Sequence, residues 1–155
     1  MAGTTSSNLV GLTELLQEGV AVLVATRDEK LRPEIARGWH VAVEGLSARL
    51  CVSVPPGSRT EENLRANGAI AVTCSRPSTY RTVQLKGVAT ELEDPTGDQL
   101  EAVQRHLDSF TREVEKVGVR PEAARTFLGV ELLSVTFEVR EVFEQTPGPK
   151  AGERL

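Results

Sequence analysis

Six apolar runs rich in Val, Ile, Leu and Thr divide this chain, and they constrain it to a fold built mainly of β-strands. β-Branched residues and the alternation of apolar with polar positions are typical of strands. Short turns link the first three runs, which favours antiparallel neighbours. Six antiparallel strands without crossover helices predict a barrel or a strongly curled sheet. The runs cover residues 20–26, 34–43, 48–54, 69–74, 79–92 and 132–145.

Four short helices are predicted beside these strands. Ser7 or Asn8 can cap the first helix, and Gly19 can end it. The Pro and Gly content of residues 146–155 predicts an irregular tail. Neither a repeat nor a linker divides the chain, so we expect a single domain over residues 1–155. The helices cover residues 7–18, 59–67 and 97–117 and a short segment that starts at Pro121.

The third of these helices is amphipathic, and its apolar stripe must pack against another element. His106 lies among the charged residues of this helix, and we expect it to be exposed. The apolar stripe consists of Leu100, Val103, Leu107, Phe110, Val114 and Val117.

Composition limits the classes of function. The 155 residues are 39% hydrophobic, which is enough for one core, and a net charge of -4 disfavours a nucleic-acid surface. No apolar run approaches the roughly 20 residues that span a bilayer. The N-terminal segment lacks the features of a secretion signal, so we expect a cytoplasmic protein. Cys51 and Cys74 are expected to be buried, reduced thiols, and the dispersed Cys and His residues offer no metal-binding spacing.

A polar cluster, Ser58-Arg59-Thr60, begins the second helix directly after a Pro-Pro-Gly turn. The first turn of a helix leaves backbone N–H groups without partners, and the helix dipole adds positive charge there. Ser58 or Thr60 can cap this end. Alternatively, Arg59 and the free N–H groups can hold a phosphate, because Gly57 lets a ligand approach the backbone. The residues alone favour the cap, since no Walker motif is present.

Three consecutive segments carry a resemblance to a known family. They read "VAVLVATRDEKLRPEIARGWHVAV", "LCVSVPPGSRTEENLRANGAIAVTC" and "YRTVQLKGVATEL". In this order they resemble the flavin-binding split-barrel family that includes the pyridoxamine 5'-phosphate oxidases, over about residues 12–92. The resemblance implies a mainly β fold, a six-stranded antiparallel split β-barrel with short flanking helices. It also implies FMN held in a groove between the two subunits of a homodimer.

The resemblance further implies a set of cofactor-binding residues. Ser58 and Arg59 match the Ser-Arg pair that binds the cofactor phosphate, whereas Thr60 stands where the oxidases usually have lysine. The lysine that the oxidases place beyond the second-strand arginine is also absent, which argues against pyridoxamine phosphate oxidation itself. No residue is identified as catalytic. The full implied set is Arg37, Gly38, Trp39, Ser53, Val54, Ser58, Arg59, Thr60, Thr82 and Gln84.

Several alternatives stay open from the sequence. The chain is either an FMN-dependent oxidoreductase acting on a small molecule, a deazaflavin-dependent reductase, or a non-catalytic split barrel that binds flavin, heme or no cofactor at all. Trp39 is either an ordinary interior or interface aromatic or an edge of the flavin site. His40 is either a structural histidine or a heme or acid–base group. We expect the tail over 146–155 to pack along the dimer surface near a cofactor groove.

Overall fold

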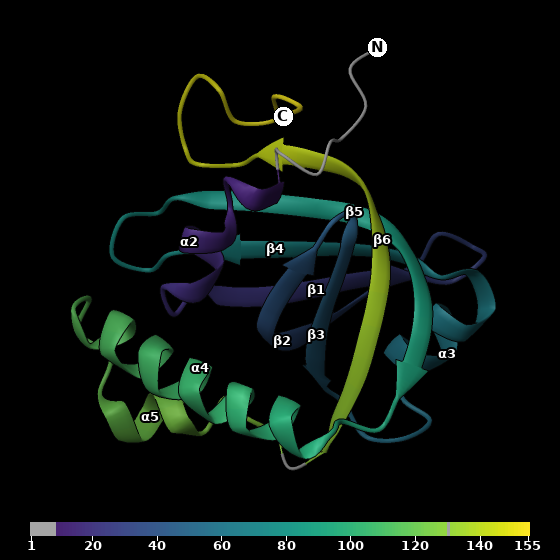
Figure 1. Ribbon diagram of the computed structural model, residues 1–155, viewed down its shortest axis with the longest axis horizontal. Coiled ribbons are helices and arrows are strands. Elements are labelled where there is room, and N and C mark those ends of the chain that lie inside the picture. Colours follow the sequence, from purple (N-terminus) through teal and green to yellow (C-terminus); the bar gives the residue numbers. More distant parts are fainter. Residues whose placement is uncertain (1–8, 130) are drawn as a thin grey trace.

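In the computed structural model, which describes residues 9–129 and 131–155, six antiparallel strands close into a barrel (Figure 1). The order around the barrel is β1-β2-β3-β6-β5-β4, so β6 closes the sheet between β3 and β5. The expected fold class is therefore confirmed. The strands are β1 (Ala21–Arg27), β2 (Pro33–Glu44), β3 (Ser47–Ser53), β4 (Ala69–Ser75), β5 (Thr82–Glu93) and β6 (Leu132–Glu144).

The observed strands follow the predicted runs closely, with the largest shift at the start of β5. This strand begins at Thr82 rather than at residue 79. The reason is a turn in which the Tyr80 N–H donates to the Arg76 carbonyl and Tyr80 takes a positive φ of 61°. A backbone in that conformation cannot continue a strand.

Alternation along the strands directs one set of side chains into the barrel, where they form the main core. Gly38 belongs to this inner set, because a Cβ there would lie 2.7 Å from a Val22 methyl carbon and 2.9 Å from one of Leu50. Large aliphatic and aromatic side chains from all six strands fill the rest of the interior. The fully buried members include Val22, Val24, Leu50, Val72, Leu85, Val135 and Phe137.

Two short helices cover the ends of the barrel (Figure 1). α2 (Thr13–Gln17) contributes Leu15 and Leu16 to the main core. α3 (Arg59–Asn67) lies at the other end and contributes Leu64 to the same core. The Asn63 side-chain amide of α3 donates to the Thr26 hydroxyl at 3.1 Å, which fastens the helix to β1.

The other two helices form a second core against the outer side of β2 and β3. α4 (Gly97–Glu115) begins with a capping box between Thr96 and Gln99, and α5 (Pro121–Arg125) packs beside it. The predicted apolar stripe of α4 is confirmed at its centre, while its two ends, Leu100 and Val117, are exposed. The second core contains Trp39, Cys51, Val103, Leu107, Phe110, Val114 and Ala124.

One sequence prediction needs correction. His106 was expected to be exposed, but it is only 6% exposed, because it lies on the side of α4 that faces the barrel. The tail is made of turns, as predicted, and it packs on β6 through a bridge between Phe143 and Arg154, while its place at a dimer surface stays a prediction. The Leu155 N–H also donates to the Val142 carbonyl at 2.8 Å. Of the predicted first helix, residues 7 and 8 lie outside the described residues.

A buried carboxylate ties the β4–β5 turn to α4. Glu113 accepts hydrogen bonds from Arg76, Ser78 and Lys116, and Arg76 also forms an ion pair with Glu18 at 2.9 Å. Burial acts to raise the pKa of Glu113, but the hydrogen bonds from Lys116, Ser78 and Arg76 outweigh it and lower this pKa to about 2. Glu113 therefore stays charged wherever the protein is folded near neutral pH.

Both cysteines are buried and free, as predicted. Burial raises the pKa of the Cys51 thiol to about 11 and that of the Cys74 thiol to about 12. Neither thiol is ionised near neutral pH, and only the thiolate is strongly nucleophilic.

Closure of the barrel between β5 and β6 depends on a glycine. A Cβ at Gly87 would stand 1.8 Å from the Glu138 carbonyl oxygen. We predict that Gly87→Ala lowers the free energy of unfolding by about 1–3 kcal/mol or more, because the two backbones would have to separate. Urea unfolding measures this. The matched control is Gly97→Ala in α4. No atom of residues 9–129 and 131–155 lies within 4 Å of a new Cβ there, so stability should be unchanged or slightly raised. Equal stability of the two variants would contradict the prediction.

Candidate functional site

A row of five side chains crosses the outer face of the barrel at one level. Arg37 on β2 is paired with Ser53 on β3 and with Leu23 on β1. Leu23 is paired with Thr73 on β4, and Thr73 with Gln84 on β5. Because directly opposite residues share one face of a sheet, these five residues form what we call the outer-face row. The predicted site residues Arg37, Ser53 and Gln84 all belong to it.

Apolar side chains lie next to this row on the same face. Leu23 is 43% exposed, and Ile35, two residues before Arg37 on β2, is 65% exposed. Ala25 is paired with Ile35 and with Ala71, and both alanines are partly exposed. The outer face of β1, β2 and β4 therefore combines exposed apolar groups with the polar ends of the row.

Arg37 is a half-buried cation without a carboxylate partner among the described residues. Its guanidinium lies 4.6 Å from the Phe127 ring centroid and 5.9 Å from that of Phe110. Burial lowers the pKa of Arg37, which expresses the cost of partly removing its charge from water. The two rings offset part of this cost by cation–π attraction, but the charge remains available to an anion.

Ser53 is positioned to donate a hydrogen bond outward. Its Oγ accepts from the Trp39 indole N–H at 2.9 Å and from the Gly129 backbone N–H at 3.3 Å. A hydroxyl oxygen has two lone pairs, so both are engaged and the hydroxyl proton is left for another acceptor. Ser53 also lines a hollow of about 310 Å³ together with Val54, Pro55 and the exposed Glu131. Arg37 and Ser53 are thus neighbouring donors without an acceptor among the residues that the structure describes.

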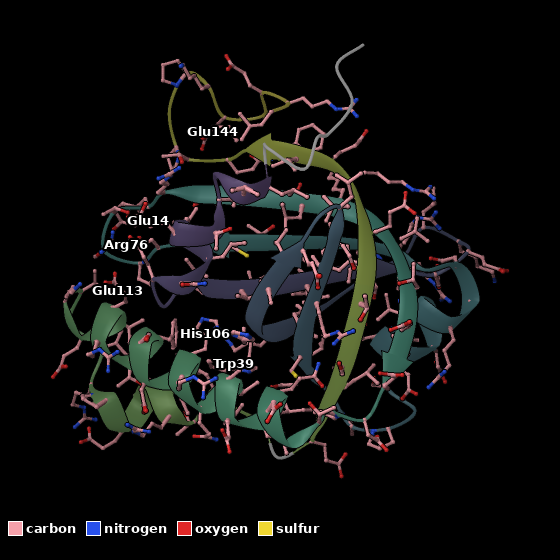
Figure 2. All side chains as sticks on the ribbon, in the orientation of Figure 1. Glu14, Trp39, Arg76, His106, Glu113 and Glu144 are labelled. Carbon is pink, nitrogen blue, oxygen red and sulfur yellow. The ribbon has the colours of Figure 1, made fainter. Side chains whose placement is uncertain are left out.

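Trp39 packs against α4, and its indole N–H holds the Ser53 hydroxyl in place. Its side chain is 1% exposed, and its ring meets those of His106 and Phe110 edge to face at 5.7 and 5.8 Å between centroids. Figure 2 shows Trp39 and His106 together between the barrel and α4. Trp39 therefore does not reach a surface where it could form the edge of a ligand site, and it acts through its hydrogen bond to Ser53.

His106 holds two backbone groups at once. Its Nδ1 accepts from the His40 backbone N–H, and its Nε2 lies 2.8 Å from the Val20 carbonyl oxygen. A neutral ring with the proton on Nε2 satisfies both contacts. Burial and the nearby His40 lower the pKa of His106 to about 4, against the opposing effect of the hydrogen bond to Val20.

The other predicted residues of β2 and β3 serve packing. Gly38 faces the barrel interior, where its lack of a side chain leaves room for Val22 and Leu50. Val54 follows β3, is buried, and lines the hollow beside Ser53. These positions contribute backbone or apolar wall to the site rather than polar contacts.

The Ser58-Arg59-Thr60 cluster is a helix cap, as the residues alone favoured. Ser58 is the N-cap, and its Oγ accepts from the Glu61 N–H at 3.2 Å. The Glu61 carboxylate accepts from the Gly57 N–H at 2.8 Å and so brings a negative charge to this helix end. Arg59 is exposed and forms an ion pair with Glu34 at 3.7 Å, while Thr60 is buried. Whether the cluster also holds a phosphate stays a prediction.

The two predicted residues of β5 lie at different places. The Gln84 amide donates to the Thr73 hydroxyl at 2.9 Å, within the outer-face row. Thr82 lies two residues earlier, where its hydroxyl is 2.7 Å from that of Ser75 and its N–H donates to the Thr146 hydroxyl at 3.0 Å. The tail is therefore fastened beside Thr82, one of the predicted site residues.

Sequence reasoning missed the aromatic support of Arg37 and the role of His106. The sequence places Phe110 in a helical stripe without indicating its partner, and no pattern singles out Phe127. Both rings come from segments far along the chain from β2, so no local pattern links them to Arg37. The residues of the row that lie between Arg37 and Gln84 could only be found from the strand register.

A larger cleft, of about 570 Å³, does not suit a phosphate. Besides Arg65, its charged lining residues are all acidic: Glu61, Glu93, Asp94 and Glu131. Among the described residues, no group of three or more His, Cys, Asp or Glu side chains could hold a metal ion. No helix in residues 9–129 and 131–155 is long and apolar enough to cross a membrane.

Solved structures with the same fold include three informative examples. Group A Streptococcus HupZ has 17% identity and a TM-score of 0.55, covering 92% of this chain and 98% of its own. An F420 reductase has 18% identity and a TM-score of 0.55, and the match covers 83% of this chain and 93% of the reductase chain. A Clostridium acetobutylicum protein of the pyridoxinephosphate oxidase family, related to general stress protein 26 of B. subtilis, has 14% identity and a TM-score of 0.51, covering 91% of each chain.

These likenesses define the class of fold. The chain has the split-barrel fold of pyridoxamine 5'-phosphate oxidase-like proteins, as the resemblance of its segments implied. No protein-family model and no curated protein matches its sequence.

The buried His106 makes stability depend on pH. Its pKa is about 4 in the folded protein and about 6.5 in an unfolded chain, so the unfolded state binds more protons between these values. We predict that the free energy of unfolding falls by about 2–4 kcal/mol as the pH falls from 7 to 4, with a smaller contribution in the same direction from His40, whose pKa burial and Arg105 also lower. Urea unfolding across this range measures the change.

The control for this prediction is His106→Gln, which removes the titrating group and should flatten most of the dependence above pH 4.5. Glu113 cannot mimic the effect there, because its contribution is lost only between about pH 4.5 and about pH 2. An unchanged pH dependence in the variant would contradict the assignment to His106.

Proposed function

We propose that this protein is an FMN-binding redox protein that transfers hydride or electrons to or from a small molecule. The observation that supports this most is the pair of unsatisfied donors on the outer face. Arg37 is a half-buried cation without a described carboxylate partner, and Ser53 beside it has a hydroxyl proton to donate. Such a pair suits an acidic group, and the guanidinium fork suits phosphate in particular.

The donor set along the row fits a flavin nucleotide. Arg37 and Ser53 would hold its acidic group, and Arg59, which is exposed and only loosely paired with Glu34, would add positive charge. Gln84 uses one amide N–H on Thr73 and keeps its oxygen and its other N–H for a polar ring edge. Leu23 and Ile35 offer apolar surface for a planar ring system.

A flavin, when bound, supplies the redox chemistry, while the chain supplies binding, orientation and electrostatics. No titratable side chain of the described residues lies in the row apart from Arg37, so proton transfer from a dedicated side chain is not part of the proposal. The role of this chain is to hold the cofactor and to exclude competing reactions by shape.

A deazaflavin is the second candidate cofactor. The F420 reductase with a similar fold supports this alternative. Heme is the third, and for heme His40 is the candidate ligand, since both ring nitrogens of His106 are engaged. The visible spectrum of the purified protein separates the three. Flavin bands, the shifted band of a deazaflavin and a Soret band each identify one cofactor.

Removing Arg37 should weaken FMN binding without unfolding the barrel. We predict that Arg37→Ala raises the Kd for FMN about 10- to 100-fold, because one charge-assisted contact to a phosphate is lost. Arg59→Ala should raise it by a smaller factor, because Glu34 already compensates part of that charge. Titration of the apoprotein with FMN, followed by flavin fluorescence, measures both.

The matched control is Arg49→Ala, an exposed arginine on β3 outside the outer-face row. It should leave the Kd unchanged. If Arg37→Ala binds FMN as tightly as the parent protein, the outer-face row is not the cofactor site.

We also propose that two copies associate through the outer face, which would cover Leu23 and Ile35 and enclose the row. Burial of exposed apolar surface drives such association. We predict a particle of twice the 16.8 kDa chain mass in light scattering, and a monomer after Ile35→Glu. Leu100→Glu, at an exposed leucine of α4, is the control and should remain a dimer. A monomeric parent protein at micromolar concentration would contradict the proposal.

A further inference from the structure

The backbone of β2 is irregular next to the proposed site. The pairing of β2 with β3 shifts between Trp39 and Ala42, which is a β-bulge. His40, inside the bulge, has a φ of 51°, a conformation that costs energy for a residue with a side chain. Bulges of this kind re-aim side chains near functional sites. Something must hold this backbone in place.

His106 provides that support. The bulge withdraws the His40 N–H from the β-ladder, and His106 Nδ1 accepts this N–H instead. On its other side, His106 Nε2–H donates to the Val20 carbonyl just before β1. One buried imidazole therefore fixes the bulge of β2 to the start of β1. It can do so only while Nδ1 is unprotonated, because a protonated Nδ1 would face another donor.

The support extends to Ser53 through Trp39. Trp39 directly precedes the bulge, its ring contacts the His106 ring edge to face, and its indole N–H donates to the Ser53 hydroxyl. A displacement of the bulge would move Trp39 and release Ser53. Ser53 is the hydroxyl donor of the proposed cofactor site. The path from His106 to that site consists of two hydrogen bonds, His40 N–H to His106 and Trp39 indole N–H to Ser53, and the peptide unit that joins Trp39 to His40.

Few other charges act on His106. His40 faces it from β2 and adds positive charge when protonated, and Arg105 lines the same pocket from α4. α2 presents Leu16 and Gln17, which do not titrate, and the segment before β1 presents only the Val20 carbonyl. No carboxylate of the described residues lines this pocket to stabilise an imidazolium.

We propose that His106 is a proton-sensitive positioning residue that sets Ser53 through Trp39, so that protonation of His106 weakens cofactor binding at the outer-face row. The inference deepens the proposed function and rests on it for its last step. The earlier steps, from His106 to Trp39, concern the protein without any cofactor and can be tested separately.

The first experiment uses the cofactor-free protein. His106 is one of two histidines and Trp39 is the only tryptophan, so each has its own signal. Proton NMR follows the two imidazoles, and indole emission follows Trp39, while the pH falls from 7 to 3.5. We expect Trp39 emission to change with the same midpoint as His106. Constant emission through the His106 titration, with the far-UV circular dichroism still native, would overturn the proposal.

Two variants identify the group responsible. His106→Gln keeps an acceptor for the His40 N–H and a donor for Val20 but does not titrate, so it should abolish the emission change. His40→Gln is the matched control, because its backbone N–H remains and the change should persist. If His106→Gln does not fold, coincidence of the two midpoints in the parent protein still decides the question, since His40 and His106 are resolved separately by NMR.

The second experiment measures FMN binding against pH. If the protonated form does not bind, the Kd should be about twofold higher at the His106 midpoint than at pH 7, beyond any change seen in His106→Gln. The phosphate of FMN titrates near pH 6 in both proteins, so the difference between them isolates His106. By linkage, saturating FMN should also lower the His106 midpoint. Identical pH profiles for the two proteins would overturn the proposal. Failure of FMN to bind at any pH would instead refute the proposed function.

Discussion

Closure of the hydrogen-bonded ladder decides where every side chain of the barrel can point. Once six strands pair in a ring, each residue faces either the interior or the outside, and its cross-strand partners face the same way. The interior is filled by aliphatic side chains, and Gly38 and Gly87 are required where no side chain fits. The filled interior leaves no room for a ligand, so the candidate site lies on the outer face, where the outer-face row is found.

The outer face is covered unevenly, and this uneven cover determines the environment of Arg37 in the candidate site. α4 and α5 cover the part of β2 and β3 that contains Trp39 and Cys51, and they stop beside Arg37. Arg37 is consequently desolvated on one side by Phe110 and Phe127 and open on the other. A cation in such a place attracts an anion more strongly than one in full solvent, because its remaining interactions are less screened.

The fold could be predicted from the sequence because its signals are local: the alternation of apolar and polar residues, the turn residues, and the glycines that end helices. The same holds for the α3 cap, since Ser58 and Glu61 lie three residues apart. The candidate site could be predicted only in part. Arg37, Ser53 and Gln84 came from a family resemblance, but their common row depends on the register of five strands, β1 to β5. The burial of His106 depends on how α4 lies against β2, and a charged helix gives no sign of a polar contact on its inner face.

The two unreactive thiols have a practical consequence. Because Cys51 and Cys74 are buried and protonated at neutral pH, maleimide reagents should pass over them in the folded protein. A cysteine introduced at a chosen surface position would then be the single labelling point of the chain. Placed on the outer face, a spin label or dye there would report directly on how closely two copies approach, without the need to remove either native cysteine from the core.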